Sequence, residues 1–147
     1  MIARLRDRLA RLLGARVPAL QVGALCVDDT GRVLLVTSRD TRRWIIPKGW
    51  PMPGRSLAQA ALQEAWEEAG VRGRAEERRL GRYRYDKRQP QGFSIPVDVQ
   101  VFLIRVEGLA DDYPERGQRN REWLTPVEAA ARVAEPRLAR LIRRLAA

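Results

Sequence analysis

The segment that most constrains the fold is a helix expected from Ser56 to Ala69. Ser56 is a good N-cap, and Gln59 stands three residues later, which is the spacing of a capping box. Gly70 is the natural stop, because glycine readily takes the left-handed conformation at a helix C-terminus. Every fourth position carries a mostly small residue, namely Leu57, Ala61, Ala65 and Ala69. Such a stripe lets a helix approach a β-sheet closely, so we expect this helix to pack on a sheet.

Strand-like segments interleave with further helices along the chain. Apolar and aromatic residues predict strands at residues 21–27, 33–37, 80–85 and 95–106, with a further short strand at 122–124. Asp28–Gly31 is the expected turn between the first two strands, and Pro47 stops a short apolar segment at 44–46. Later helices are expected near residues 126–133 and 137–146. Strands interleaved with helices predict a mixed α/β domain.

The domain is expected to cover residues 17–147, because a chain of 147 residues fits one hydrophobic core. Before it, residues 1–16 predict a basic amphipathic helix. One face of that helix carries Ile2, Leu5, Leu9 and Leu12, with arginines opposite. Packing against its own domain is the expected role of this helix. Contact with a membrane surface or nucleic acid is the alternative.

Histidine is absent from the sequence, and Cys26 is the only cysteine. These two facts exclude Ser-His-Asp and Cys-His catalysis and an ordinary zinc site built by the protein. Any bound metal should therefore be a hard cation with oxygen ligands, which means Mg²⁺ or Mn²⁺. Cys26 lies in an apolar strand segment and is expected to be a buried core thiol.

The formal net charge is +10, almost wholly from arginine, and favours phosphate-rich partners. Charge alone does not separate a small polyphosphate from nucleic acid, which stays the less favoured partner. No apolar run is long enough to cross a bilayer, and arginines interrupt any secretory pattern at the N-terminus. The sequence thus predicts a cytoplasmic protein without a transmembrane segment.

Three glutamates, Glu64, Glu67 and Glu68, share one face of the expected helix at i, i+3 and i+4. Each pair of like charges costs about 0.2–0.5 kcal/mol. Negative charge in the last turn opposes the helix dipole by about 0.3–1 kcal/mol. A solvated acidic face is one interpretation of this cluster. The other is a binding site for a strongly cationic group such as Mg²⁺, with Gly49 in the preceding loop offering exposed backbone to metal and phosphate.

The loop and helix together resemble the signature of the Nudix hydrolase family. That signature is a glycine, five residues, Glu, seven residues, then Arg-Glu-aliphatic-x-Glu-Glu-x-Gly-aliphatic. Here the pattern reads Gly49, five residues, Arg55, seven residues, then Gln63 followed by the three glutamates in register, Gly70 and Val71. Five of the seven fixed letters match. The resemblance implies an α/β/α sandwich with a mixed sheet, the acidic box on a loop-helix-loop, and hydrolysis of a phosphoanhydride bond.

The family's metal ligands correspond to Gly49, Glu64, Glu67 and Glu68 of this chain, with Mg²⁺ or Mn²⁺ as the cofactor. The three glutamates are also the catalytic candidates, and by resemblance Glu68 or Glu67 accepts the proton of the attacking water. Some relatives use a glutamate from a distant loop instead, and Glu115 is the candidate here. The family's supporting Glu is Arg55 in this chain, and its Arg that steers the catalytic carboxylate is Gln63. Restoring arginine at position 63 is therefore expected to raise activity.

The residues outside the box are similar to the subgroup that cleaves diphosphoinositol polyphosphates and diadenosine polyphosphates. This similarity implies a small polyphosphorylated substrate held by basic residues, namely Arg39, Lys48, Arg119 and Arg137. Alternatives are a Nudix hydrolase of nucleoside triphosphates or capped RNA, and a catalytically silent regulator that binds a nucleotide. Tyr83 and Tyr85 lie among basic residues, where they either pack in the sheet or stack on a base. Trp50 is a candidate pocket residue, whereas the core is expected to hold Trp44, Trp66 and Trp123.

Overall fold

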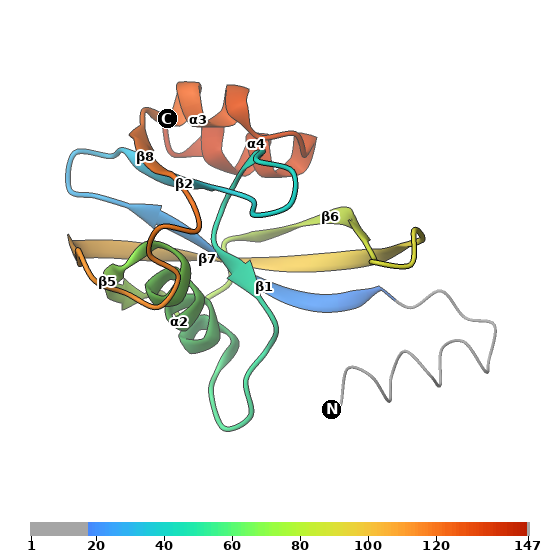
Figure 1. Ribbon diagram of the computed structural model, residues 1–147. Helices are drawn as coiled ribbons and strands as arrows, with labels where there is room; N and C mark the ends of the chain where they lie inside the picture. The colour runs from blue at the N-terminus through green and yellow to red at the C-terminus, as the bar shows by residue number, and fades with distance from the viewer. Residues whose placement is uncertain (1–17, 147) are drawn as a thin grey trace.

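The computed structural model describes residues 18–146, so the helix predicted for residues 1–16 lies outside the described part of the chain. The described residues form an eight-stranded sheet with helices on both faces (Figure 1). The strands are β1 (Ala19–Val27), β2 (Val33–Thr37), β3 (Trp44–Ile45), β4 (Lys48–Gly49), β5 (Val71–Ala75), β6 (Gly81–Arg88), β7 (Ser94–Leu109) and β8 (Arg121–Leu124). The helices are α2 (Leu57–Ala69), α3 (Pro126–Arg132) and α4 (Pro136–Arg144). The predicted α/β sandwich is confirmed.

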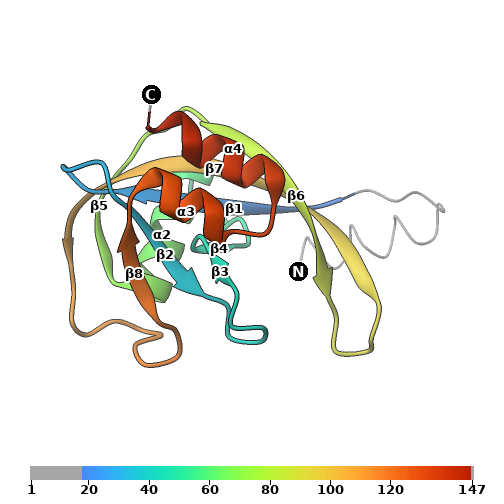
Figure 2. The ribbon, with the colours of Figure 1, turned by 90° about the horizontal axis from the view of Figure 1, so that it is seen from above.

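The sheet is mixed, as expected. Its main order is β3-β2-β1-β7-β5, with β4 on β1, β6 on β7 and β8 on β2. The central pair, β1 and β7, is parallel and stays in register from Ala19 opposite Val97 to Val27 opposite Arg105. The other pairs are antiparallel. Viewed from above, α3 and α4 lie across the sheet, and the hairpin of β6 and β7 extends to one side (Figure 2).

Alternate side chains of β1 enter two different hydrophobic layers, as the two-residue period of a strand requires. Val22, Ala24 and Cys26 belong to the layer beneath α2, whereas Leu25 belongs to the layer beneath α3 and α4. Cys26 is fully buried, so the predicted core thiol is confirmed.

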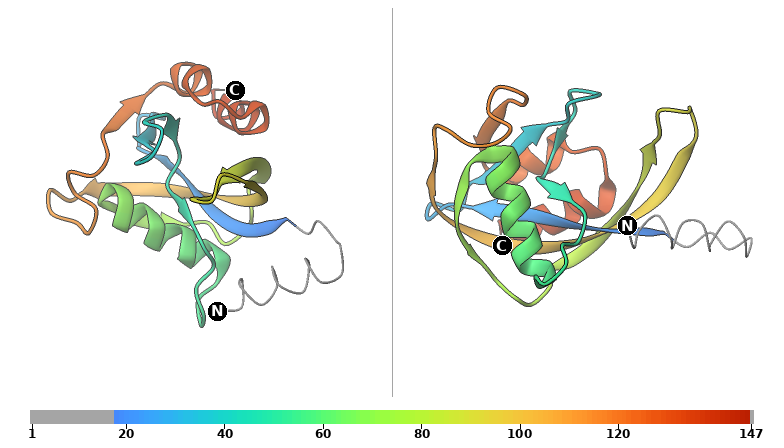
Figure 3. Two further views of the ribbon diagram at one scale, coloured as in Figure 1. Left: turned by 45° about the vertical axis from the view of Figure 1, so that its right-hand side comes forward. Right: turned by 60° about the horizontal axis from the view of Figure 1, so that its bottom comes forward.

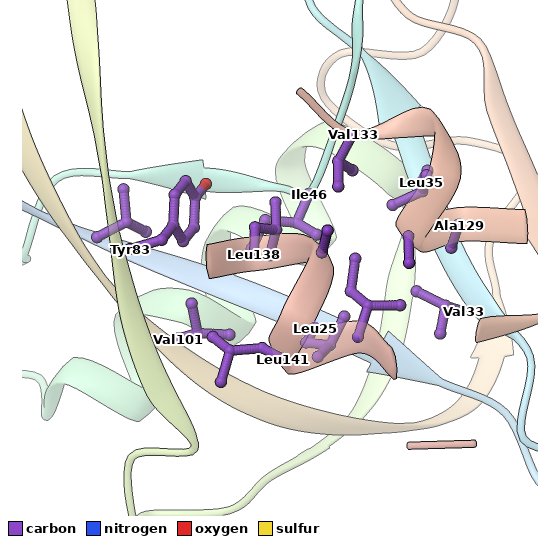
Figure 4. Close-up of a cluster of buried hydrophobic side chains, with 14 of the residues drawn as sticks. Leu25, Val33, Leu35, Ile46, Tyr83, Val101, Ala129, Val133, Leu138 and Leu141 are labelled. Atoms are coloured by element: carbon purple, nitrogen blue, oxygen red, sulfur yellow. The ribbon is translucent and has the colours of Figure 1, made fainter. Parts of the chain in front are cut away.

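The layer under α3 and α4 is filled by long side chains from both sides (Figure 4). Leu138 and Leu141 of α4 meet Leu25 and Val101 of the sheet, and Tyr83 of β6 joins them. The Tyr83 ring is only 2% exposed. Tyr83 therefore packs in the core, and the alternative that it stacks on a bound base is wrong.

Helix α2 lies alone on the opposite face of the sheet (Figure 3). Ser56 caps it as predicted, with its hydroxyl accepting from the Gln59 N–H and the Gln59 side chain accepting from the Ser56 N–H. Gly70 ends it with a φ of 70°, in the left-handed region. The buried face is almost entirely alanine: Ala58, Ala60, Ala61, Ala65 and Ala69. These small side chains bring the helix backbone close to the sheet.

Strand β5 was not predicted from the sequence. Its residues Val71–Ala75 alternate between buried or half-buried positions and exposed arginines, so too few apolar residues mark it. Strand β6 is longer than predicted because it pairs with β7 as far as Arg88 opposite Ser94, and β7 continues to Leu109 because its end pairs with β5. The three tryptophans expected in the core are half-buried, and of these Trp66 lies against Arg72.

No helix within residues 18–146 is long and apolar enough to span a membrane.

Candidate active site

Strand β4 comes before the loop that leads to α2. In β4, Gly49 pairs with Val22 of β1. This pairing holds the Gly49 backbone directly against the carboxylate of Glu64. A Cβ built on Gly49 would overlap the carboxyl group of Glu64. Only glycine at position 49 lets the loop backbone approach that carboxylate, as expected where a backbone must come close to another group.

Glu68 is the deepest of the three glutamates, at 4% exposure. Its Oε2 accepts a 2.7 Å hydrogen bond from the backbone N–H of Lys48. Its Oε1 lies 2.8 Å from Nη2 of Arg119, whose side chain is 8% exposed. The pair is a buried, hydrogen-bonded ion pair that ties the start of β4 to the loop before β8.

Arg119 holds a second carboxylate as well. Its Nε and Nη2 each lie 3.2 Å from Oε1 of Glu115, and its Nη1 donates to the Thr37 carbonyl oxygen. The backbone N–H of Glu115 donates to the carbonyl oxygen of Glu67, which fixes this loop to the end of α2. Glu115 thus lies beside the glutamates of the helix, although it is distant from them in the sequence.

Burial, and after it the neighbouring charges, changes the acidity of these carboxylates. Burial, and then the negative charges of Glu68, Glu67 and Glu115, raise the pKa of Glu64 from 4.5 to about 8. Burial raises the pKa of Glu68 to about 7, although Arg119 opposes this rise. Within residues 18–146, the Glu64 carboxylate forms no hydrogen bond and no ion pair. Its ionised form is therefore the least compensated charge of the site.

The third glutamate, Glu67, lies beside the two positions that depart from the family signature. The side-chain amide of Gln63 donates a 3.3 Å hydrogen bond to Oε1 of Glu67. Nη1 of Arg55 donates a 3.0 Å hydrogen bond to the oxygen of the same amide. Arg55 and Gln63 are therefore in contact, rather than two independent replacements.

The three glutamates are not gathered around one point. Among residues 18–146, no group of three His, Cys, Asp or Glu side chains is arranged to hold a metal ion. Each glutamate faces a different neighbour: Glu64 faces Gly49, Glu67 faces Gln63 and Glu68 faces Arg119. The assignment of these glutamates as metal ligands therefore stays a prediction.

The residue types nevertheless fit a hard dication. Every candidate ligand offers oxygen, from the carboxylates of Glu64, Glu67 and Glu68 or the carbonyl of Gly49. The close approach of Gly49 to an unpaired carboxylate places two such donors side by side. A cation on this face would replace repulsion by attraction.

The basic residues expected to bind substrate occupy different environments. Arg39 is exposed, donates to Gln118 and lies 3.8 Å from Glu115. The Lys48 ammonium lies 4.9 Å from the centre of the Tyr85 ring, and burial lowers its pKa to about 8. Arg119 is buried between carboxylates and does not face solvent as a free phosphate ligand.

Arg137 belongs to α4, whereas the three glutamates belong to α2, and its predicted contact with substrate stays a prediction. It is exposed in the first turn of α4, on the face of the sheet opposite α2, and its side chain forms no ion pair within the described residues. Trp50 is 38% exposed in the loop after β4, where the Lys87 ammonium lies 5.7 Å from its ring.

Sequence reasoning missed Arg121 of β8. Its Nη1 donates to the carbonyl oxygens of Ala69 and Ala110, at 2.7 and 3.0 Å, and its guanidinium stacks on Tyr113. Helix α2 has no basic residue in its own last turn. Arg121 supplies that positive charge from another strand, which favours the helix dipole. No local pattern marks this role, because the contact spans 52 positions in the sequence.

A family model described as the NUDIX domain matches residues 17–145. The chain belongs to the NUDIX domain family. Nudix hydrolase 4 of Arabidopsis thaliana is 36% identical over 98 residues, which are 67% of this chain and 45% of that protein. Diphosphoinositol polyphosphate phosphohydrolase 2 of Mus musculus is 33% identical over 111 residues, which are 74% of this chain and 57% of that protein. The chain spans about half the length of the curated relatives it matches.

Solved structures share the fold of this NUDIX domain. The Ap4A hydrolase of C. elegans superposes with a TM-score of 0.64 at 20% identity, covering 88% of this chain and 97% of that one. A NUDIX hydrolase from Nitrosomonas europaea gives a TM-score of 0.67 at 22% identity, covering 86% and 87%. At such identities the likeness shows the fold alone.

Proposed function

We propose that this NUDIX domain is a hydrolase that cleaves a phosphoanhydride bond in a small polyphosphorylated substrate with the help of Mg²⁺ or Mn²⁺. The observation that carries the proposal is the Glu64 carboxylate. It is half-buried against Gly49, unpaired, and surrounded by the charges of Glu67, Glu68 and Glu115. A protein retains such an arrangement at a cost in stability, and a bound dication would offset that cost.

In this proposal, Glu64, Glu67, Glu68 and the carbonyl of Gly49 hold the metal. The metal would lower the pKa of a bound water and offset the charge that develops on the phosphates. A carboxylate of the site would accept the proton of the attacking water. Glu67 and Glu68 are the first candidates by family resemblance. Glu115 is a further candidate, since its N–H bond to Glu67 keeps it next to them.

The proposed substrate is a diphosphoinositol polyphosphate or a diadenosine polyphosphate. The phosphohydrolase of Mus musculus and the Ap4A hydrolase of C. elegans are among the similar proteins that carry names of this kind. The site also has basic residues around it: Arg39 is exposed at its edge, and Lys48 is the first residue of β4, next to Gly49. Arginine binds phosphate through paired hydrogen bonds, which suits a substrate with many phosphates. Cytoplasmic location stays a prediction, and some relatives are named as mitochondrial or chloroplastic.

The test is a hydrolysis screen with and without Mg²⁺, using inositol pyrophosphates, dinucleoside polyphosphates, nucleoside triphosphates and capped RNA. Glu67→Gln and Glu68→Gln should each lower turnover about 100-fold or more while the fold survives. The matched control is Glu107→Gln, an exposed glutamate of β7 paired with Arg74. Unchanged turnover in both site variants would remove these residues from the reaction.

A catalytically silent regulator is the second candidate, and the Arg119 ion pair favours it. Glu68 is neutralised by Arg119, and no three acidic side chains of residues 18–146 are arranged to hold a metal. This candidate requires tight binding of a nucleotide with no Mg²⁺-dependent release of phosphate. Titration calorimetry on the substrates of the screen distinguishes the two: binding without turnover on any of them would favour the regulator.

A further inference from the structure

Arg55, Gln63 and Glu67 form a continuous hydrogen-bonded chain from the loop to the acidic face of α2. Arg55 donates to the Gln63 oxygen at 3.0 Å, and the Gln63 nitrogen donates to Glu67 Oε1 at 3.3 Å. The two residues that depart from the family signature are thus the two that precede Glu67 in this chain of contacts.

The chemistry of the three groups fixes the orientation of the Gln63 amide. A guanidinium only donates hydrogen bonds, and a carboxylate only accepts them. The amide therefore has one orientation that satisfies both neighbours, with its oxygen toward Arg55 and its nitrogen toward Glu67. A positive charge on the oxygen side also polarises the amide and strengthens its donation to the carboxylate.

The position of Arg55 gives no benefit to the helix itself. It stands immediately before the N-cap Ser56, where the positive end of the helix dipole disfavours a cation. The pair it makes with Gln63 is exposed, and exposed polar pairs contribute little to stability. Helical side chains lean toward the N-terminus, so Gln63 and Glu67, four residues apart, are directed back toward Arg55.

We infer that Arg55 is a positioning residue for Glu67 that acts through Gln63. In the family signature the steering arginine stands on the helix, at the place of Gln63, and its acidic supporter precedes the helix. In this chain the positive charge stands on the loop, at Arg55. The neutral amide of Gln63 connects it to Glu67 through two hydrogen bonds. The inference rests on the proposed function, since it concerns how Glu67 is held for a metal.

This arrangement reverses the expectation for Gln63→Arg. The sequence alone predicted that this change raises activity by restoring the family pairing. In the structure, a new guanidinium at position 63 would meet the guanidinium of Arg55, and the two would repel. The single variant should therefore lose function. The exchanged variant Arg55→Gln/Gln63→Arg, which keeps the net charge and lets the arginine donate to both neighbours, should recover it.

The experiment measures Mn²⁺ affinity by electron paramagnetic resonance, without substrate, and then kcat and KM on the best substrate of the screen. Arg55→Gln and Gln63→Arg should each weaken Mn²⁺ binding about tenfold, as losses of groups that orient metal ligands do, and lower kcat with KM nearly constant. The exchanged variant should return both quantities to within about threefold of the wild type. The control is Arg140→Gln, an exposed arginine of α4 on the opposite face of the sheet.

The outcomes separate the two proposals. If the wild type binds Mn²⁺ and hydrolyses a substrate, but Arg55→Gln matches the Arg140→Gln control, the positioning role is overturned and the proposed function stands. If both singles lose affinity and the exchanged variant loses as much as their sum, Arg55 does not act through Gln63. If the wild type neither binds Mn²⁺ nor turns over any substrate, the proposed function fails and the inference fails with it. Thermal melting of each variant shows that losses do not come from unfolding.

Discussion

Replacing Glu64 by glutamine should stabilise the metal-free protein at alkaline pH. Glutamine keeps the shape of the side chain beside Gly49 and removes one of the mutually repelling charges. The folded protein raises the pKa of Glu64 above its value in the unfolded chain. Stability from this group is therefore full below about pH 4.5 and is lost as the pH rises through about 8. The glutamine variant does not suffer this loss.

The size of the effect follows from the pKa. A rise from 4.5 to about 8 corresponds to about 5 kcal/mol, at about 1.36 kcal/mol per pH unit, if no solvent screened the charge. The Glu64 side chain is only half-buried, so water and salt screen most of this. We expect about 1–2 kcal/mol, or about 3–6 °C in Tm for a domain of this size.

The assay is thermal unfolding in EDTA at several pH values from 5 to 9, for the wild type, Glu64→Gln and the control Glu107→Gln. The Tm of Glu64→Gln should rise relative to the wild type as the pH increases, whereas the control should not show this trend. Mg²⁺ should invert the order at high pH, because the ionised carboxylate then has a cation to bind. A difference in Tm that stays constant from pH 5 to 9 would show that the combined cost of burying Glu64 in its ionised form and placing it beside other carboxylates has been overestimated.

Three further variants test other contacts of the site. Gly49→Ala should weaken Mn²⁺ binding and cost at most about 1 kcal/mol in urea unfolding, because the added methyl group displaces the Glu64 carboxylate, which is the end of a flexible side chain. Arg119→Met should cost about 3–5 kcal/mol at pH 8, since it leaves Glu68 buried without a counter-charge. A smaller loss at pH 5 is expected, because Glu68 can then take a proton. Arg121→Met should destabilise the end of α2 by about 1–3 kcal/mol, and hydrogen exchange should localise the loss to that helix end, because two carbonyl oxygens lose their donor. Loss spread evenly over the domain would contradict this.

The elements that the sequence predicted best are those with strong local signals. Helix α2 has a capping box at Ser56, an alanine face and a terminal Gly70, and its boundaries were correct. The apolar run of β1 likewise placed Cys26 in the core. Strand β5 has no such signal, because it has Val71 and Ala75 as its only apolar side chains and is defined by its pairing with β7. A local sequence pattern predicts a helix or strand only where the apolar residues of that segment themselves show which side chains are buried.

The same difference between local sequence signals and long-range contacts applies to the site. Spacing along one helix was enough to put Glu64, Glu67 and Glu68 side by side. It was not enough to show what each faces, since Arg119 reaches Glu68 across 51 positions of the sequence and Arg121 reaches the end of the same helix from β8. The resemblance implied a phosphate contact for Arg119, whereas the fold gives it two carboxylates.

These contacts sharpen the electrostatic argument for a cation. The sequence showed two costs on α2, negative charge at its C-terminal end and repulsion along its face. The protein offsets the first cost itself, because Arg121 donates to the terminal carbonyl of Ala69. It offsets the second cost only in part. Arg119 is one buried guanidinium, and it faces Glu68 and Glu115. One such charge does not neutralise four neighbouring carboxylates, and the remainder falls on Glu64, the group without a partner in residues 18–146. A dication bound at Glu64 would therefore supply the positive charge that the rest of the described chain does not place beside this carboxylate.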